Sequence, residues 1–260
     1  MPHQVTTAKV RDVTVRLHRG GGGRPALFLH GAGGVPLWLP FFEALAEDYD
    51  LLVPDHPGFG ASEDPKWLRS ISDVAMFYLD AIEEWGLRDI HVIGNSLGGW
   101  IAAEMAIRDC SRFRSLTLLA PAGIRIKGVP MGDNFIWSPE EQARNLFADP
   151  SFAERMLSQP PSEEQMDIQL RNRFTTAKLA WQPRLFDPDL EKWLHRVKVP
   201  THVVWGNADK ILPGAYAELW RQRLPDARVT LVPNCGHLPH VEKADSVTAS
   251  VKAFLSTAAA

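Results

Sequence analysis

The distribution of hydrophobic and polar positions divides the chain into short apolar runs that alternate with helical patterns. Residues 10–18 alternate apolar and polar positions, which predicts an exposed opening strand or hairpin. Residues 26–30 form a continuous apolar run, as is typical of a strand that is buried on both faces, and residues 50–55 are predicted to be another buried strand. The order of these patterns predicts an α/β fold with a mostly parallel central sheet flanked by helices.

The clearest helical pattern covers residues 70–86, where apolar residues recur on one face and Gly86 suits the C-terminal end. The same reasoning predicts a series of further elements along the chain. They are helices at 38–49, 97–109, 213–223 and 241–256, and strands at 89–95, 115–122, 199–206 and 227–233.

Residues 123–195 break this alternation. They contain scattered prolines, three helix-like stretches and several aromatic residues, but no clear buried strand. We therefore predict a core formed by residues 1–122 and 196–260, with an inserted helical lid at 123–195. Ordinary surface helices are the alternative for this stretch.

Composition limits the possible functions. The 260 residues fit one large domain, with 45% hydrophobic and 23% charged residues, and the formal net charge of −3 gives no electrostatic reason to bind nucleic acid. The two cysteines, Cys110 and Cys235, form no disulfide framework or zinc motif. The N-terminal residues lack the apolar core of a signal peptide, and no apolar run is long enough to span a membrane. We expect a cytoplasmic protein.

Ser96 lies where a predicted strand meets a predicted helix, in a G-x-S-x-G sequence. Such a sequence builds a sharp turn that exposes the serine hydroxyl, and Gly94 and Gly98 leave room for strand and helix to pass each other. The backbone N–H of Leu97 lies at the helix N-terminus and points toward an anion position. A turn with only a structural role is the alternative.

A serine hydroxyl needs a base, and His237 is the preferred one among nine histidines. It follows a strand and a turn, so we expect it at the carboxyl edge of the sheet, where active sites of open α/β sheets lie. His240 is its competitor. Asp209, three residues after Gly206, is the candidate acid at the same edge, although turn-capping aspartates are commoner.

The remaining histidines have less context. His30 at a strand end is expected to fix loop geometry, and His91 and His202 inside strands are expected to be packed or surface residues. The stretch at 27–34 ends in small residues, so the N–H of Ala32 could join that of Leu97 in holding an oxyanion. A phosphate-binding loop is the rival, but the stretch lacks the lysine and Ser/Thr of a P-loop.

Five successive stretches resemble the α/β-hydrolase superfamily: "HGAGG" (30–34), "DHPGFGAS" (55–62), "GNSLGG" (94–99), "WGNADKILP" (205–213) and "NCGHLPHVE" (234–242). The resemblance covers essentially the whole chain. It implies the α/β-hydrolase fold, with Ser96 as nucleophile, Asp209 as acid, His237 as base, and Ala32 and Leu97 as oxyanion donors. Serine at the nucleophile position disfavours the haloalkane dehalogenase and epoxide hydrolase branches.

Within the family, two branches compete. Asn95 and the lid residue Arg173 are similar to residues of carbon–carbon hydrolases that cleave ring-fission products of aromatic degradation. However, Leu238 stands where those enzymes usually carry tryptophan, and "LLAPAGI" and "NCGH" look equally like monoacylglycerol lipases and carboxylesterases. We therefore expect hydrolysis of carboxylic esters through an acyl-enzyme. The alternatives are cleavage of vinylogous diketo acids, then perhydrolase, lactonase or amidase chemistry, and a catalytically silent binding protein.

The expected partner is a small, largely apolar ester, and the sequence indicates no oligomeric state. Trp100, Trp137, Phe147 and Trp181 could line an apolar pocket, although each fits the core of the lid equally well. We expect no metal and no organic cofactor. The predicted substrate-binding residues are Gly31, Gly33, Asn95, Trp100, Trp137, Arg173, Trp181 and Leu238.

Overall fold

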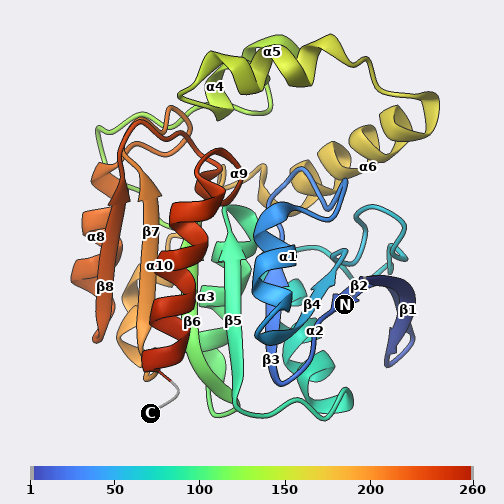
Figure 1. Cartoon of the computed structure of the whole chain (residues 1–260), viewed down its shortest axis with the longest axis vertical. Coiled ribbons are helices and arrows are strands. Elements are labelled where there is room, and N and C mark those ends of the chain that lie inside the picture. Colours follow the sequence, from blue (N-terminus) through green and yellow to red (C-terminus); the bar gives the residue numbers. More distant parts are fainter. Residues whose placement is uncertain (1–2, 259–260) are drawn as a thin grey trace.

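The structure is a computed structural model that describes residues 3–258, so residues 1, 2, 259 and 260 of the predicted core lie outside the described residues. Within that range the chain forms an eight-stranded sheet in the order β1-β2-β4-β3-β5-β6-β7-β8 (Figure 1). The strands are β1 (Gln4–Val10), β2 (Val13–Gly20), β3 (Arg24–Leu29), β4 (Tyr49–Pro54), β5 (Ile90–Asn95), β6 (Phe113–Leu119), β7 (Thr201–Gly206) and β8 (Ala227–Val232).

The sheet is mostly parallel. The hairpin β1–β2 and the pair β2–β4 are antiparallel, and every pair from β4 to β8 is parallel. The mostly parallel sheet and the opening hairpin are therefore confirmed, although β2 is largely buried and not exposed. The continuous apolar run of β3 serves two cores, because Leu27 and Leu29 pack on one face while Ala26 and Phe28 pack on the other.

Helices cover both faces of the sheet. In Figure 1, α1 (Pro40–Ala46) and α10 (Ala244–Thr257) lie in front, while α2 (Ile71–Glu84) and α3 (Leu97–Arg108) lie behind. The helix α8 (Ala215–Arg223) shares the core of α2 and α3, and the short α9 (Pro239–Glu242) precedes α10.

Helix α2 begins where its sequence directs. The side chains of Ser70 and Asp73 cap the first turn reciprocally, and Gly86 follows the helix with a φ of +67°. Its apolar face, which includes Val74 and Tyr78, is fully buried. The predicted helix at 70–86 is therefore confirmed to within two residues at its C-terminal end.

The segment between β6 and β7 is helical. It contains α4 (Pro139–Leu146), α5 (Pro150–Ser158), α6 (Glu163–Ala180), α7 (Leu190–Trp193) and the 3₁₀-helix η1 (Leu194–Arg196). In Figure 1 the helices α4 to α6 lie above the carboxyl ends of β5 and β7. We call residues 123–195 the insertion; its role as a lid stays a prediction.

Across residues 3–258, no helix is both long enough and apolar enough to cross a membrane.

Candidate active site

Ser96 occupies a strained turn between β5 and α3. Its φ of +51° is unusual for a residue with a side chain, and a Cβ on Gly98 would lie 2.0 Å from the carbonyl oxygen of Leu29. A Cβ on Gly94 would lie 2.4 Å from the Gly98 carbonyl oxygen. The glycines of the G-x-S-x-G sequence are therefore required by backbone contacts, as their spacing predicts.

Three side chains that are far apart in the sequence form one hydrogen-bonded relay. Ser96 Oγ lies 2.9 Å from His237 Nε2, and His237 Nδ1 lies 2.8 Å from Asp209 Oδ2. A carboxylate can only accept, so His237 Nδ1 carries the proton and Nε2 accepts from the serine hydroxyl. With His237 2% and Asp209 6% exposed, the relay is shielded from water.

The second carboxylate oxygen of Asp209 fixes its own loop. Oδ1 accepts hydrogen bonds from the backbone N–H groups of Ile211 and Leu212, at 2.8 and 2.9 Å. Asp209 is thus both the turn-capping residue that composition favours and a partner of His237. The two functions use different oxygens.

The loop that carries His237 is fastened to the insertion. The N–H of His237 donates to the carbonyl oxygen of Leu146 at 2.8 Å. The carboxylate of Glu242 accepts from the N–H of Gly236 at 2.6 Å and from those of Ala148 and Asp149 at 2.9 and 2.6 Å. Helices α4 and α5 are thereby joined, through backbone contacts, to the loop of the relay.

A small cavity of about 20 Å³ lies beside Ser96. Ala32 and Leu97 both line it, and Leu97 is the first residue of α3, whose leading N–H groups have no partner within the helix. The other lining residues are mostly apolar: Ala122, Asn134, Phe135, Thr176, Leu185, Ile211 and Leu212. The insertion thus leaves room for little more than a water molecule at the serine.

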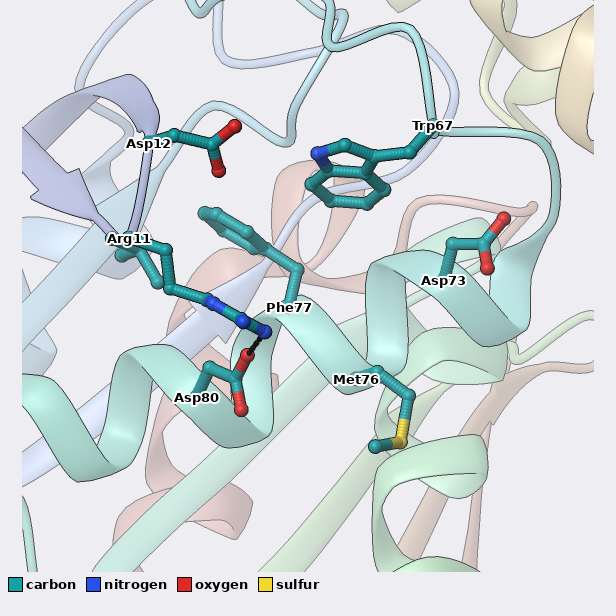
Figure 2. Close-up of a pocket in the computed structure, with 8 residues that line it drawn as sticks. Arg11, Asp12, Trp67, Asp73, Met76, Phe77 and Asp80 are labelled. Carbon is teal, nitrogen blue, oxygen red and sulfur yellow. Dashed lines mark hydrogen bonds and ion pairs between the residues drawn. The ribbon is translucent and has the colours of Figure 1, made fainter.

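A larger hollow of about 580 Å³ lies elsewhere, between the β1–β2 hairpin and α2 (Figure 2). Arg11 and Asp80 form an ion pair 3.0 Å apart at its edge, beside Phe77 and the half-exposed ring of Trp67. None of the relay residues lines it. Because the hydrogen-bonded serine, histidine and aspartate lie elsewhere, this hollow is not the candidate active site, whatever its size.

Two other titratable side chains near the relay, His240 and Cys235, have pKa values shifted by burial. His240 is buried against Phe28 and Phe41, and this burial lowers its pKa to about 3. Burial raises the pKa of the Cys235 thiol to about 12. At neutral pH the first is an uncharged core residue and the second a protonated thiol. This geometry supports His237 over His240.

A sequence profile of the α/β hydrolase fold family matches residues 25–244. The chain belongs to the α/β hydrolase fold family. Its relatives include the dihydrolipoyllysine-residue acetyltransferase component of an acetoin cleaving system from Cupriavidus necator, which is 30% identical over 95% of this chain and 68% of that protein. Lipase 1 of Psychrobacter immobilis is 28% identical over 90% of this chain and 77% of the lipase.

A third relative is named for a different substrate. The 2-hydroxymuconate semialdehyde hydrolase of Pseudomonas sp. strain CF600 is 27% identical over 95% of this chain and 92% of that enzyme. Among solved structures, a membrane phospholipase A superimposes with a TM-score of 0.83 and 27% identity, covering 98% of this chain and 86% of the other. The identities to lipases and to the semialdehyde hydrolase are nearly equal, so they establish the family and leave the substrate open.

Of the two predicted substrate-binding glycines, Gly31 lies close to the serine. A Cβ on Gly31 would lie 3.4 Å from the Cβ of Ser96, and the carbonyl oxygen of Gly33 accepts a hydrogen bond from Asn172. Asn95 is buried, and its Nδ2 donates to Leu119 in β6. The indole of Trp100 donates to a buried carboxylate, that of Glu104. Neither Asn95 nor Trp100 lines the small cavity.

The predicted contacts from the insertion also lie outside that cavity. Arg173 donates to the carbonyl oxygens of Phe135 and Trp137, both at 3.0 Å. The half-exposed ring of Trp181 packs edge-on against Phe135. Leu238 packs in a cluster with Ala143, Phe147 and Ala153. The roles of Trp137, Arg173, Trp181 and Leu238 in substrate binding stay predictions.

Two other histidine assignments agree with their surroundings. His30 Nδ1 lies 2.7 Å from the Gly31 carbonyl oxygen, so it contacts the loop that it was expected to fix. Burial lowers the pKa values of His91 and His202 to about 4, as fits packed strand residues. No group of three His, Cys, Asp or Glu side chains among the described residues could hold a metal ion.

Sequence reasoning missed Asn172 and Glu242. Asn172 lies on α6 and bridges two loops of the core through its amide. Glu242 is the last residue of the "NCGHLPHVE" stretch, and its carboxylate accepts hydrogen bonds from three backbone N–H groups. The sequence signals for them are weak: Asn172 is a polar residue next to the candidate Arg173, and Glu242 is a polar residue at the end of a recognised motif.

Proposed function

We propose that this chain is a serine hydrolase that cleaves carboxylic esters through an acyl-enzyme. The observation that carries the proposal is the continuous relay from Ser96 to His237 to Asp209, with spacings of 2.9 and 2.8 Å. The serine stands at a strained turn beside the N–H of Leu97, where a negatively charged oxygen would be stabilised.

The geometry suits a two-step reaction. Ser96 Oγ attacks the ester carbonyl carbon while His237 Nε2 takes the hydroxyl proton, and Asp209 stabilises the imidazolium. The N–H groups of Ala32 and Leu97 receive the developing oxyanion. When the tetrahedral intermediate collapses, the carbon–oxygen bond to the alcohol breaks and His237 gives its proton to the leaving oxygen. A water molecule, deprotonated by His237, then attacks the acyl group, and Ser96 regains the proton as the acid leaves.

Two features support an ester over a vinylogous diketo acid. The small cavity is lined mostly by apolar side chains, and the described side chains that line it include no cation to pair with a substrate carboxylate. The guanidinium of Arg173 instead binds two carbonyl groups of the insertion. The apolar lining suits a largely apolar ester. Because the cavity itself holds little more than a water molecule, the insertion acts as a lid that must move aside for such a substrate to reach Ser96.

Carbon–carbon bond cleavage is the second candidate. It is supported by the similarity to the semialdehyde hydrolase from Pseudomonas, which extends over nearly the whole of both chains. Asn95, directly before Ser96, also resembles the residue that carbon–carbon hydrolases carry at this position.

A labelling experiment tests the proposal. The wild-type chain is expected to react with a fluorophosphonate probe and to hydrolyse p-nitrophenyl butyrate, while Ser96→Ala should do neither. Absence of labelling in the wild type would favour a silent binding protein. If a vinylogous diketo acid were turned over orders of magnitude faster than esters, the second candidate would replace the first.

A further inference from the structure

Asn172 is a buried amide that joins the insertion to the core. Its Nδ2 donates to the carbonyl oxygen of Gly33 at 2.9 Å, and its Oδ1 accepts from the N–H of Gly60 at 2.8 Å. The side chain is 3% exposed, so water does not compete for these bonds. Since one partner can only accept and the other can only donate, the orientation of the amide is fixed.

The residues of α6 around Asn172 also bind the loop of the core at 58–62. The hydroxyl of Thr175 donates to the carbonyl oxygen of Gly58 at 2.7 Å, and Arg171 donates to the carbonyl oxygens of Gly58 and Ser62. These bonds hold α6 against residues 58–62. Asn172 differs from its neighbours because it also reaches the loop at 31–34.

From Gly33 a chain of hydrogen bonds leads toward the serine. The Gly33–Gly34 peptide is planar, so holding its carbonyl group also sets the direction of the Gly34 N–H. That N–H donates to the carbonyl oxygen of Gly31 at 3.1 Å. The Gly31–Ala32 peptide is planar in turn, and its N–H points away from its carbonyl oxygen. The orientation of the Ala32 N–H, in the residue that lines the cavity with Ser96, therefore depends on bonds made at Gly31 and Gly33.

The core supplies the other support of this loop. The N–H of His56 donates to His30 Nε2 at 3.0 Å, so His30 carries its proton on Nδ1 and donates it to the Gly31 carbonyl oxygen at 2.7 Å. Burial lowers the pKa values of both histidines, which keeps this arrangement neutral at pH 7. One support thus belongs to the core, and the other comes from the insertion.

We propose that Asn172 is a positioning residue that couples the seating of α6 to the orientation of the Ala32 N–H. The inference rests on the proposed function, in which that N–H binds the oxyanion. A hydrogen bond weakens steeply when its donor is misdirected, whereas the mostly apolar walls that bind the substrate are unaffected. Loss of the Asn172 contact should therefore reduce transition-state binding more than substrate binding.

The test compares Asn172→Asp with Asn145→Asp. Asp at 172 keeps an acceptor for Gly60 but replaces the donor to Gly33 with an oxygen. Asn145 lies on α4, where its amide donates to the carbonyl oxygen of Glu141, so the same isosteric change is made in the same insertion. Both variants are assayed for kcat and KM with p-nitrophenyl butyrate, and for inhibition by a trifluoromethyl ketone, which forms an oxyanion adduct with a nucleophilic serine.

We expect Asn172→Asp to lower kcat by about 10- to 100-fold, less than the roughly 10²- to 10³-fold loss when an oxyanion donor is removed outright. KM should stay within about twofold, and inhibition by the ketone should weaken by the same factor as kcat. Asn145→Asp should match the wild type. Asn172→Ser, which is too short to reach Gly33, should repeat the result if the aspartate variant does not fold.

The inference is overturned if kcat and ketone inhibition are unchanged, if KM alone changes, or if the control loses as much activity as the Asn172 variants. Failure of the proposed function gives a different result. In that case the wild type itself would not be labelled at Ser96, or Ser96→Ala would keep the esterase activity.

Discussion

The hydrogen bonds of the buried Glu242 carboxylate can be tested directly by measuring stability. It is 6% exposed, and among residues 3–258 no lysine or arginine forms an ion pair with it. Its charge is balanced instead by three backbone N–H groups, two of them at the start of α5. Removing that charge without changing the shape of the side chain is the sharpest perturbation.

Glu242→Gln makes this change. The amide keeps one acceptor oxygen, so at best the bonds to Ala148 and Asp149 survive as neutral hydrogen bonds, while the N–H of Gly236 faces an NH₂ group. A hydrogen bond to a charged group contributes about 1.5–3 kcal/mol, and a neutral one about 0.5–1.5 kcal/mol. One bond lost and two weakened lower the free energy of unfolding by about 3–5 kcal/mol.

The assay is thermal unfolding followed by circular dichroism at pH 7. Since a chain of this size loses roughly 2–4 °C in Tm per kcal/mol, we expect Tm to fall by about 6–20 °C. Glu83→Gln is the matched control, because the Glu83 side chain is 71% exposed and its variant should unfold with the wild type. A Tm for Glu242→Gln within about 2 °C of the wild type would refute the reasoning.

Two further predictions concern Ser96 and acid stability. Gly98→Ala places a methyl group 2.0 Å from the Leu29 carbonyl oxygen, so fluorophosphonate labelling should fall by about 100-fold, whereas Gly22→Ala, which meets no atom within 4 Å, should label normally. The pKa of His240 is lowered to about 3, so between pH 6.5 and 3 the unfolded chain binds a proton that the folded chain does not, and stability is lost on acidification. At pH 5 this loss is about 2 kcal/mol. Urea unfolding at pH 5 and 7.5 should therefore show a smaller difference in the free energy of unfolding for His240→Leu than for the wild type. An equal difference in both proteins would contradict this account.

The sequence predicts those parts of the molecule whose cause is local. The stretches at 26–29 and 51–53 are apolar throughout because β3 and β4 are covered on both faces. The order of strands and helices then limits the topology. The glycines around Ser96 follow from a backbone approach that no side chain tolerates. His237 and Asp209 could be placed because both follow strands of one parallel sheet.

The hydrogen bonds that could not be predicted are those from side chains to backbone groups, because backbone groups leave no signature in the sequence. Asn172 and Glu242 bind backbone groups, which every residue has, so no pairing of residue types reveals them. The sequence pointed instead to Arg173, one position further along α6. Neighbouring residues on a helix point about 100° apart, and this rotation carries Arg173 from the core loops to the carbonyl groups of Phe135 and Trp137.

Together these contacts divide the site into two parts with different origins. The core supplies the serine turn and the neutral histidine pair behind the loop at 31–34. The insertion holds two backbone groups of the core, the His237 N–H through the Leu146 carbonyl oxygen and the Gly33 carbonyl oxygen through the Asn172 side chain. Contacts with backbone groups fix orientation without specifying the side chains around them, so most side chains of the insertion can change without disturbing these two contacts. The loop that carries His237 then depends on a carboxylate at Glu242, and the proposed orientation of the Ala32 N–H depends on an amide at Asn172.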